Sequence, residues 1–324
     1  MSALLERLGV ERPVVQAGMG GGLSRAPLAA AVSAAGGLGT VGFLPPDALR
    51  REIAAARERT ERPVAANLLL PFAREPHFAA ASEAGVVVTF WGRPRRRTGR
   101  VWIHQCGSVE EARAAQAAGA DAVIAQGVEA GGHVRGTTPA LELLERVRAA
   151  LPDGYPVLVA GGIATADDVR AALDAGAAAA VLGTRFLLTP ESGAHPLYRE
   201  RLVHADATVL TELFGMGWPA KHRVVENDAL RRWTGRDARG PAAVRALNRA
   251  TAPLLARAPA RMQEALAARQ SPRLPLLGPV GPTGDRPAAL VEAGALYAGE
   301  TVARIRDVRP AGELVRELDP AGRA

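Results

Sequence analysis

Residues 101–126, VWIHQCGSVEEARAAQAAGADAVIAQ, contain one complete unit of the fold, in which two short apolar runs flank a helix. After the run Val101–Cys106, Ser108 is placed to cap a helix, with Glu111 three residues later. The helical pattern ends at Gly119, a residue type that stops helices in the left-handed conformation, and Ala122–Gln126 follows. Apolar runs without strict alternation are typical of parallel strands buried on both faces. We therefore predict a β-α-β unit.

The same unit recurs along the chain. Gly162–Asp168 opens a second helix with Thr165 as its predicted N-cap, and that helix ends at Gly176. Similar apolar runs alternate with amphipathic helical patterns from Pro13 to Leu188. We therefore predict an α/β fold, a closed (β/α)8 TIM barrel rather than an open sheet. Its strands are assigned to Val14–Met19, Leu38–Phe43, Val64–Leu70, Val86–Trp91, Val101–Cys106, Ala122–Gln126, Val157–Ala160 and Ala178–Leu182.

The fourth unit departs from this pattern. Only residues 92–100 separate Val86–Trp91 from Val101–Cys106, and this segment is too short for a full crossover helix. We predict that the fourth helix is absent or reduced to a turn.

The chain changes character after Leu188. Helical patterns such as Gly240–Ala256 and Ala260–Arg269 replace the alternation, and residues 271–286 resemble a loop. Helical periodicity returns in Pro287–Val308 and Gly312–Leu318. We predict a barrel over residues 1–190, a helical cap over residues 191–286, and C-terminal helices over residues 287–324 that pack back on the barrel.

Charge and composition exclude several classes of protein. The 324 residues carry a formal net charge of +7, but Lys221 is the single lysine and most arginines lie beside acids on predicted helix faces. Only residues 93–97 form a dense basic cluster, without interleaved aromatic residues, so nucleic-acid binding is not expected. Cys106 is the single cysteine, which excludes an internal disulfide. With no signal-peptide layout and no apolar run of ~18 residues, we expect a soluble cytoplasmic protein without a membrane span.

Glycines cluster where the predicted strands end. Strand seven ends in Ala160–Ile163 and strand eight in Leu182–Arg185, and glycines after these two strands match the phosphate site of many such barrels. A glycine lets the backbone approach an anion and point its N–H groups at it. Each glycine alone is equally compatible with a tight turn, but two successive loops of this kind predict a bound phosphate group. Neither a Walker loop nor a dinucleotide fingerprint is present.

His133 is the strongest candidate for a catalytic residue. It follows a Gly-Gly pair at the predicted carboxyl end of strand six, where an imidazole that titrates near neutral pH can act as a general base. No second ligand lies at metal spacing from it, so we predict no metal site. His104 is expected to be buried and hydrogen-bonded, His222 structural or solvated, and Cys106 packed as a small apolar side chain. Glu129 has two open roles, as an acid catalyst or as a capping residue.

The run Gln126–His133, QGVEAGGH, resembles the signature of the nitronate monooxygenase (2-nitropropane dioxygenase) family. The resemblance continues in QAGM (residues 16–19), AGGI (160–163), GTRF (183–186) and LYAGE (296–300), so it covers nearly the whole chain. It implies a barrel that binds FMN beneath a helical domain. The implied reaction is the oxidation of alkyl nitronates, and of nitroalkanes, by O2 to a carbonyl compound and nitrite. The partners are then a small-molecule substrate and O2, and a homodimer is an open option.

The resemblance also assigns residues by matching position. His133 becomes the base that takes a proton from the carbon next to the nitro group. The flavin would be lined or hydrogen-bonded by Ala17, Gly18, Met19, Asn67, Gln126 and Gly131, and its phosphate held by Gly162, Gly183 and Thr184, with Gly161 and Leu182 beside them. The sequence departs from the family pattern in the short fourth crossover, at Val181-Leu182 and in residues 278–285.

Three other functions stay open. A flavin-dependent enoyl-ACP reductase shares a similar Gly-Gly-His motif, and Arg93–Arg100 could bind an acidic carrier protein. A tailoring oxidase or dehydrogenase of the same superfamily is a second alternative. A third is an arginine-rich binding module, which would bind polyanions in a salt-sensitive way and hold no flavin.

Overall fold

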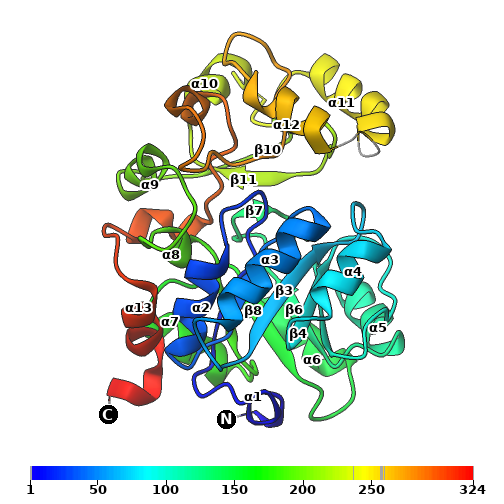
Figure 1. Ribbon diagram of the computed structural model, residues 1–324, viewed down its shortest axis with the longest axis vertical. Helices are drawn as coiled ribbons and strands as arrows, with labels where there is room; N and C mark the ends of the chain where they lie inside the picture. The colour runs from blue at the N-terminus through cyan, green and yellow to red at the C-terminus, as the bar shows by residue number, and fades with distance from the viewer. Residues whose placement is uncertain (1, 236, 256–257, 259, 324) are drawn as a thin grey trace.

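The structure, a computed structural model, describes residues 2–323 except 236, 256, 257 and 259 (Figure 1). Within these residues eight parallel strands form one sheet in the order β1-β9-β8-β6-β5-β4-β3-β2. The two ends of this order meet through a parallel bridge between Val15 and Leu38, which closes the sheet. The predicted (β/α)8 barrel is therefore confirmed. The strands are β1 Val14–Gln16, β2 Gly39–Val41, β3 Val64–Leu69, β4 Val86–Phe90, β5 Val101–Cys106, β6 Ala122–Gln126, β8 Val157–Ala160 and β9 Ala180–Leu182.

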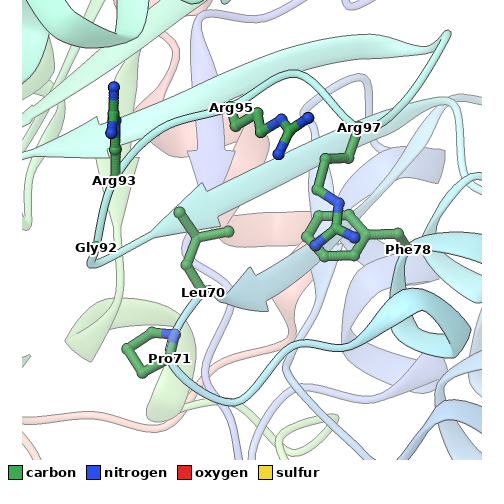
Figure 2. Close-up of a pocket in the computed structure, with 7 residues that line it drawn as sticks. All are labelled: Leu70, Pro71, Phe78, Gly92, Arg93, Arg95 and Arg97. Carbon is green, nitrogen blue, oxygen red and sulfur yellow. The ribbon is translucent and has the colours of Figure 1, made fainter.

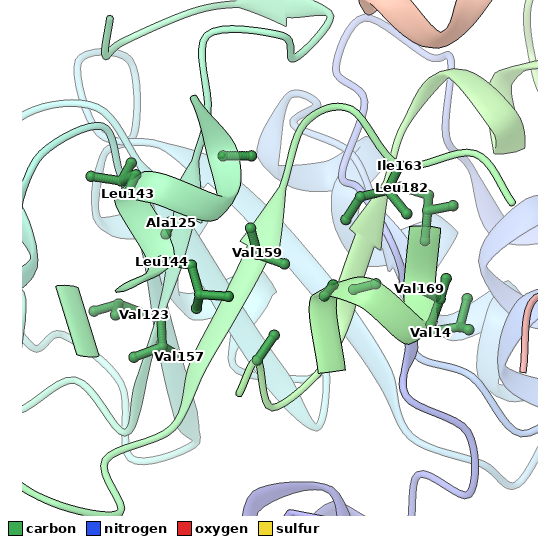
Figure 3. Packing of buried hydrophobic residues seen from close by; sticks show 14 of the residues in the cluster. Val14, Val123, Ala125, Leu143, Leu144, Val157, Val159, Ile163, Val169 and Leu182 are labelled. Atoms are coloured by element: carbon green, nitrogen blue, oxygen red, sulfur yellow. The ribbon is translucent and has the colours of Figure 1, made fainter. Parts of the chain in front are cut away.

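Helices surround the barrel and bury its outer face. Apolar side chains fill the layer between strands and helices, among them Val123, Val159 and Leu143 (Figure 3). The helix α13 (Ala311–Leu318) also packs here, against α2 and α7, so the C-terminal segment helps to cover the barrel wall. The helices between the strands are α2 Ala26–Ala34, α3 Pro46–Arg57, α4 Glu75–Ala81, α5 Val109–Ala117, α6 Ala140–Ala150 and α7 Ala166–Asp174.

The predicted helix boundaries are confirmed at both repeated units. The Ser108 hydroxyl accepts a hydrogen bond from the Glu111 N–H at 3.3 Å, and the Thr165 hydroxyl accepts one from the Asp168 N–H at 3.2 Å. Gly119 and Gly176 follow the two helices with φ of +87° and +90°. These positive φ values require glycine, because other side chains are strained there.

One end of the barrel is closed by apolar packing. The N-terminal helix α1 (Ala3–Leu8) places Leu4 and Leu5 against inward-facing strand residues such as Ile103 and Ile124. Alternation along the strands sends their neighbours to the outer layer. The opposite end, where the strands have their carboxyl termini, carries the long loops and faces the upper part of Figure 1. We name the elements from β10 to α12 there, which begin at Val209 and end at Ala268, the upper lobe.

The fourth crossover has no helix, as predicted. Residues 91–100 connect the parallel strands β4 and β5 without any helical turn. Arginine side chains attach this segment to the barrel. Arg96 forms an ion pair with Asp121 at 2.7 Å, and the Arg100 Nε atom donates to the Ser82 carbonyl at 2.9 Å.

Helical segments follow the last strand, as predicted, but they are joined by an unpredicted sheet. In this antiparallel sheet β11 (His222–Val224) lies between β10 (Val209–Thr211) and β7 (Gly132–His133), and β7 belongs to the loop after β6. Ala256, at the end of one predicted helix, lies outside the described residues. Among the described helices, none is both long and apolar enough to span a bilayer. The helices are α8 Thr184–Leu187, α9 Pro196–Val203, α10 Asp228–Trp233, α11 Ala242–Leu255 and α12 Ala260–Ala268.

The prediction of helical structure throughout Pro287–Val308 is wrong. The structure has two short 3₁₀ turns there, η1 (Ala288–Glu292) and η2 (Glu300–Arg304). Between them the chain is extended, because its backbone pairs with β11 and the residue after it. The Val225 N–H donates to the Leu296 carbonyl at 2.8 Å.

The turn η1 also contacts the upper lobe. The Asn227 side-chain amide donates to the carbonyls of Val291 and Gly294, both at 2.9 Å. The division of the chain into three parts stays a prediction. A last 3₁₀ turn, η3, covers Pro320–Arg323.

Candidate active site

The predicted cofactor residues lie at the carboxyl ends of the strands. The structure brings two of them into contact, since the Asn67 Nδ2 atom donates to the Gly18 carbonyl at 3.2 Å. A Cβ atom on Gly18 would overlap the Asn67 side chain, so only glycine fits there. The segments are Ala17–Met19 after β1, Asn67 in β3, Gln126 at the end of β6, Gly131 before β7, Gly161-Gly162 after β8, Leu182 at the end of β9, and Gly183-Thr184 after it.

The loops after β8 and β9 are tied together by the C-terminal segment. Gly161 and Gly162 have φ of +109° and +73°, and their N–H groups have no hydrogen-bond partner among the described residues. The Arg304 guanidinium donates to the Gly162 carbonyl at 3.0 Å. The Thr184 hydroxyl accepts a hydrogen bond from the Gly299 N–H at 2.8 Å. This corner of the barrel therefore presents free N–H groups on a fixed backbone.

Gly131 lies against the same C-terminal segment. A Cβ atom on Gly131 would overlap the backbone of Ala298 and Gly299. The Glu300 N–H donates to the Glu129 carbonyl at 3.0 Å in the same contact. The Glu129 carboxylate accepts from the Ala140 N–H at the start of α6, at 3.0 Å. Of its two open roles, the structure supports the capping role for Glu129.

Two predicted cofactor residues have other visible partners. The Gln126 Nε2 atom donates to the His133 carbonyl at 3.0 Å, and its Oε1 atom accepts from the Arg135 N–H at 3.2 Å. Both ends of this amide therefore hold the backbone at the end of β7 and just after it. The Leu182 side chain faces away from the barrel interior and packs in the outer core, so only its backbone lies at the site. Their predicted contacts with a flavin stay predictions.

His133 lies on β7 in a cage of aromatic rings. Its imidazole stacks on the Trp218 indole with ring centroids 3.6 Å apart and an interplanar angle of 14°. The Tyr297 and His222 rings lie 5.6 Å and 5.4 Å from it. The His133 Nε2 atom is buried and has no hydrogen-bond partner in the described part of the chain. Burial, and to a smaller extent the neighbouring His222, holds the pKa of His133 well below its usual range, so this imidazole is neutral at pH 7.

His222 is fixed in one neutral form beside His133. Its Nδ1 atom donates to the Ala220 carbonyl at 2.9 Å, and its Nε2 atom accepts from the Phe214 N–H at 3.3 Å. Burial lowers the pKa of His222 to about 4. Because both ring nitrogens are occupied, His222 is structural, in agreement with the sequence prediction.

Three aromatic residues of the site were not found by sequence reasoning. Tyr297 carries a buried hydroxyl without a partner among the described residues, and burial raises its pKa well above the usual range. Trp218 comes from the loop between β10 and β11, and Trp91 packs edge-on against it at 5.2 Å. These residues are far apart in sequence and follow no local pattern, so only the fold brings them together. We name His133, Trp218 and Tyr297 the mouth cluster.

His104 and Cys106 are buried in the barrel wall, as predicted. The Trp102 Nε1 atom donates a hydrogen bond to the Thr89 hydroxyl at 2.7 Å. The Thr89 hydroxyl in turn donates its own proton to the His104 Nδ1 atom at 2.8 Å. Burial lowers the pKa of His104 to about 4. The Cys106 Sγ atom contacts the Ile124 carbonyl at 3.4 Å, and burial raises the pKa of its thiol. We name Thr89, Trp102 and His104 the wall cluster.

A family model supports the resemblance that the motifs suggested. The model described as nitronate monooxygenase matches residues 1–88 and 93–320. The chain belongs to the nitronate monooxygenase family. The match is interrupted at residues 89–92, where β4 ends and the shortened crossover begins.

Curated relatives of this nitronate monooxygenase family member carry two kinds of name. The nitronate monooxygenase of Pseudomonas aeruginosa is 36% identical over 251 residues, which are 60% of this chain and 71% of the relative. An indene-4-carboxyl-CoA dehydrogenase of Mycobacterium tuberculosis is 34% identical over 259 residues, 74% of this chain and 70% of the relative. Both names belong to oxidoreductases.

Solved structures share the fold over the full chain. The nitroalkane oxidase of Streptomyces ansochromogenes superposes with a TM-score of 0.76 at 32% identity, covering 99% of this chain and 98% of that one. FabK of Thermotoga maritima gives a TM-score of 0.76 at 28% identity, covering 100% and 96%. This nitronate monooxygenase family member is therefore an enzyme, an oxidoreductase of a flavin-dependent family.

Proposed function

We propose that this enzyme uses FMN to oxidise alkyl nitronates, and nitroalkanes, with O2 to a carbonyl compound and nitrite, with His133 as general base. The family membership supports the reaction class. The observation that carries the proposal is the His133 Nε2 atom, which is buried at the barrel mouth and has no partner among the described residues. Buried polar atoms are nearly always paired, so an unpaired one at a strand end indicates a group that meets its partner in the substrate.

The residues present fit a flavin mononucleotide. Gly161 and Gly162 offer N–H groups without partners among the described residues, and their positive φ values require glycine. Backbone N–H groups of this kind can donate hydrogen bonds to a phosphate. In the proposal Gly162, Gly183 and Thr184 hold the phosphate, with Gly161 and Leu182 beside them. The flavin lies against Ala17, Gly18, Met19, Asn67, Gln126 and Gly131. When bound, FMN supplies the electron acceptor and the reaction with O2 that the protein side chains lack.

His133 moves the proton in this mechanism. Because burial keeps the imidazole neutral, its Nε2 atom can accept a proton from the carbon next to a nitro group. Gln126 holds the His133 backbone carbonyl, and the Trp218 indole stacked on the imidazole fixes the direction of the ring. A nitronate has already lost this proton, so the base is needed only for neutral nitroalkanes.

Tyr297 binds the nitro group in this mechanism. Its raised pKa keeps the phenol protonated, and its hydroxyl has no other acceptor in the described chain, so it can donate a hydrogen bond to a nitro or nitronate oxygen. The indoles of Trp91 and Trp218 exclude water from this position, which strengthens such a hydrogen bond.

The test is turnover by the FMN-loaded protein. We expect propionate 3-nitronate and O2 to yield nitrite, measured colorimetrically, with matching consumption of O2. Nitrite in the absence of O2, or no nitrite at all, would contradict the proposed reaction. The partners in this proposal are a small-molecule substrate and O2, and the reaction takes place in the cytoplasm. A homodimer is an open option, which sedimentation analysis tests.

A second candidate function is a flavin-dependent reaction of a thioester, with reduced nicotinamide as electron donor. It is favoured by the similarity to FabK and to the carboxyl-CoA dehydrogenase. Oxidation of NADH or NADPH in the presence of crotonyl-CoA, without nitrite release from nitronates, would replace the first proposal by this one.

A further inference from the structure

The shortened fourth crossover borders an open hollow on the active-site end of the barrel. The hollow has a volume of about 250 Å³, several times the ~30 Å³ that one water occupies. Its floor is apolar, from Leu70 and Pro71 after β3 and Phe78 on α4 (Figure 2). The rest of its lining is Gly92, Arg93, Arg95 and Arg97. All these arginines come from the segment that lacks a crossover helix.

The arginines of this segment have two separate roles. Arg96 and Arg100 hold the segment against the barrel, through Asp121 and the Ser82 carbonyl. Arg97 stacks on the Phe78 ring at 4.4 Å and forms an ion pair with Glu75, so its charge is balanced.

Arg93 and Arg95 differ from their neighbours. Both side chains are exposed, and neither makes a hydrogen bond or an ion pair with the described residues. Two unbalanced guanidinium groups beside an apolar floor suit an anion attached to an organic chain. Arginine matches the geometry of phosphate and carboxylate groups in particular.

Two residues next in sequence to the lining of the hollow contact the mouth cluster. Trp91 precedes Gly92, and its ring packs edge-on to His133 at 6.3 Å. Phe72, which follows Pro71, packs against Trp218 at 5.3 Å. Trp91 is the only non-glycine residue of the described chain with a positive φ, +65°, a strained value for a bulky side chain. The Trp91 ring contacts join the start of this segment to the mouth cluster.

We propose that the hollow lined by Arg93 and Arg95 binds an oxyanion, a phosphate or a carboxylate, at the far end of the molecule that reacts beside His133. The inference rests on the proposed function, because it assumes that the substrate reacts at His133. It adds that the physiological substrate is acidic at a second point, and that an alkyl nitronate without a second acidic group lacks one binding interaction.

Calorimetric titration of the FMN-loaded protein tests the hollow without turnover. The probes are pyrophosphate for the phosphate source and succinate for the carboxylate source. In Arg93→Gln/Arg95→Gln, we expect the affinity for one of these probes to fall about tenfold. If only the affinity for pyrophosphate falls, the substrate carries a phosphate. If only the affinity for succinate falls, the substrate carries a carboxylate. The matched control is Arg113→Gln/Arg146→Gln, which removes two exposed charges from α5 and α6 and should change affinity by less than about twofold.

The inference is overturned if neither probe binds the unmodified protein, or if the control variant loses as much affinity as the Arg93/Arg95 variant. A kinetic comparison adds a second measurement. We expect the Arg93/Arg95 variant to raise KM for the nitronate of 8-nitrooctanoate, whose carboxylate lies at the end of a long chain, but not for the nitronate of 1-nitrooctane, with kcat unchanged. An equal rise for both substrates would contradict the role of the hollow. Arginine-dependent probe binding without nitrite release would refute the proposed reaction and leave the hollow standing.

Discussion

The wall cluster and the mouth cluster each bury a histidine among aromatic side chains, but they treat its polar atoms differently. In the wall cluster the Thr89 hydroxyl lies between Trp102 Nε1 and His104 Nδ1 and satisfies both. In the mouth cluster His133 Nε2 and Tyr297 Oη have no partner among the described residues. Burying a polar atom without a partner costs stability. The contrast indicates that the wall cluster stabilises the fold. In the proposed function the unpaired atoms of the mouth cluster instead find their partners in the substrate.

Replacing His133, the base in the proposed function, should lower the activity more than any change in the wall cluster. In His133→Asn we expect kcat/KM for nitroethane to fall about 10²–10⁴-fold, because both ring nitrogens of the neighbouring His222 are occupied by hydrogen bonds and cannot take over the proton. Turnover of preformed ethyl nitronate should fall much less, and the flavin should stay bound. The matched control is the exposed His204→Asn, which should retain the activity. Nitroethane turnover at the unmodified rate would remove His133 from the mechanism.

Thr89→Val should lower the stability and leave the activity unchanged, the opposite of what we expect for His133→Asn. It keeps the shape of the side chain but leaves Trp102 Nε1 and His104 Nδ1 buried without partners, which should lower the free energy of unfolding by about 2–3 kcal/mol. Chemical denaturation measures this change, and kcat per bound flavin should stay the same. Thr251→Val, at a hydroxyl that donates only to two carbonyls of its own helix, provides the control with a small effect. Loss of kcat in Thr89→Val would mean that the two clusters are coupled.

Two tyrosines with buried hydroxyl groups allow the comparison to be made with one chemical change, the removal of a hydroxyl. The Tyr198 hydroxyl donates to the Tyr297 carbonyl at 2.7 Å, while the Tyr297 hydroxyl has no partner in the described chain. Tyr297→Phe should therefore leave Tm unchanged or higher and lower kcat/KM for nitronates about tenfold. Tyr198→Phe should lower the stability by about 1 kcal/mol. A lower Tm in Tyr297→Phe would show that its hydroxyl is paired after all.

The smallest expected effect is in the pH profile of nitroethane oxidation. The base must be neutral, so activity is lost as pH falls through its pKa. Because burial lowers the pKa of His133, this loss in kcat/KM should occur below pH 6.5, the ordinary value for histidine. An inflection at or above the ordinary value would indicate a hydrated or acid-paired imidazole.

The barrel could be predicted from sequence because its signals are local. Ser108 and Thr165 cap helices with residues three positions away, and Gly119 and Gly176 end those helices within the same unit. Three of the predicted strands, among them β5, have the bounds that the apolar runs gave them.

The mouth of the barrel could be predicted only in part. His133 was found because a Gly-Gly pair precedes it at a strand end. Trp218 and Tyr297 come from segments about 85 and 164 residues later in the chain. They reach His133 because β7 pairs with β11, and because the extended chain after η1 also pairs with β11. The same pairing explains why the predicted helix at Pro287–Val308 is interrupted. Sequence periodicity describes a segment alone and does not report the partner that overrides it.

The contact between Gly131 and Gly299 has a consequence for the order in which the enzyme is made. The segment that meets Gly131, and whose Gly299 N–H binds Thr184, lies after every strand of the barrel and after the upper lobe. During synthesis on the ribosome, the strands can pair before this segment has emerged, but its contacts with Gly131 and Thr184 cannot form. Capture of the cofactor is therefore expected to be one of the last events in maturation, after translation has passed Arg304.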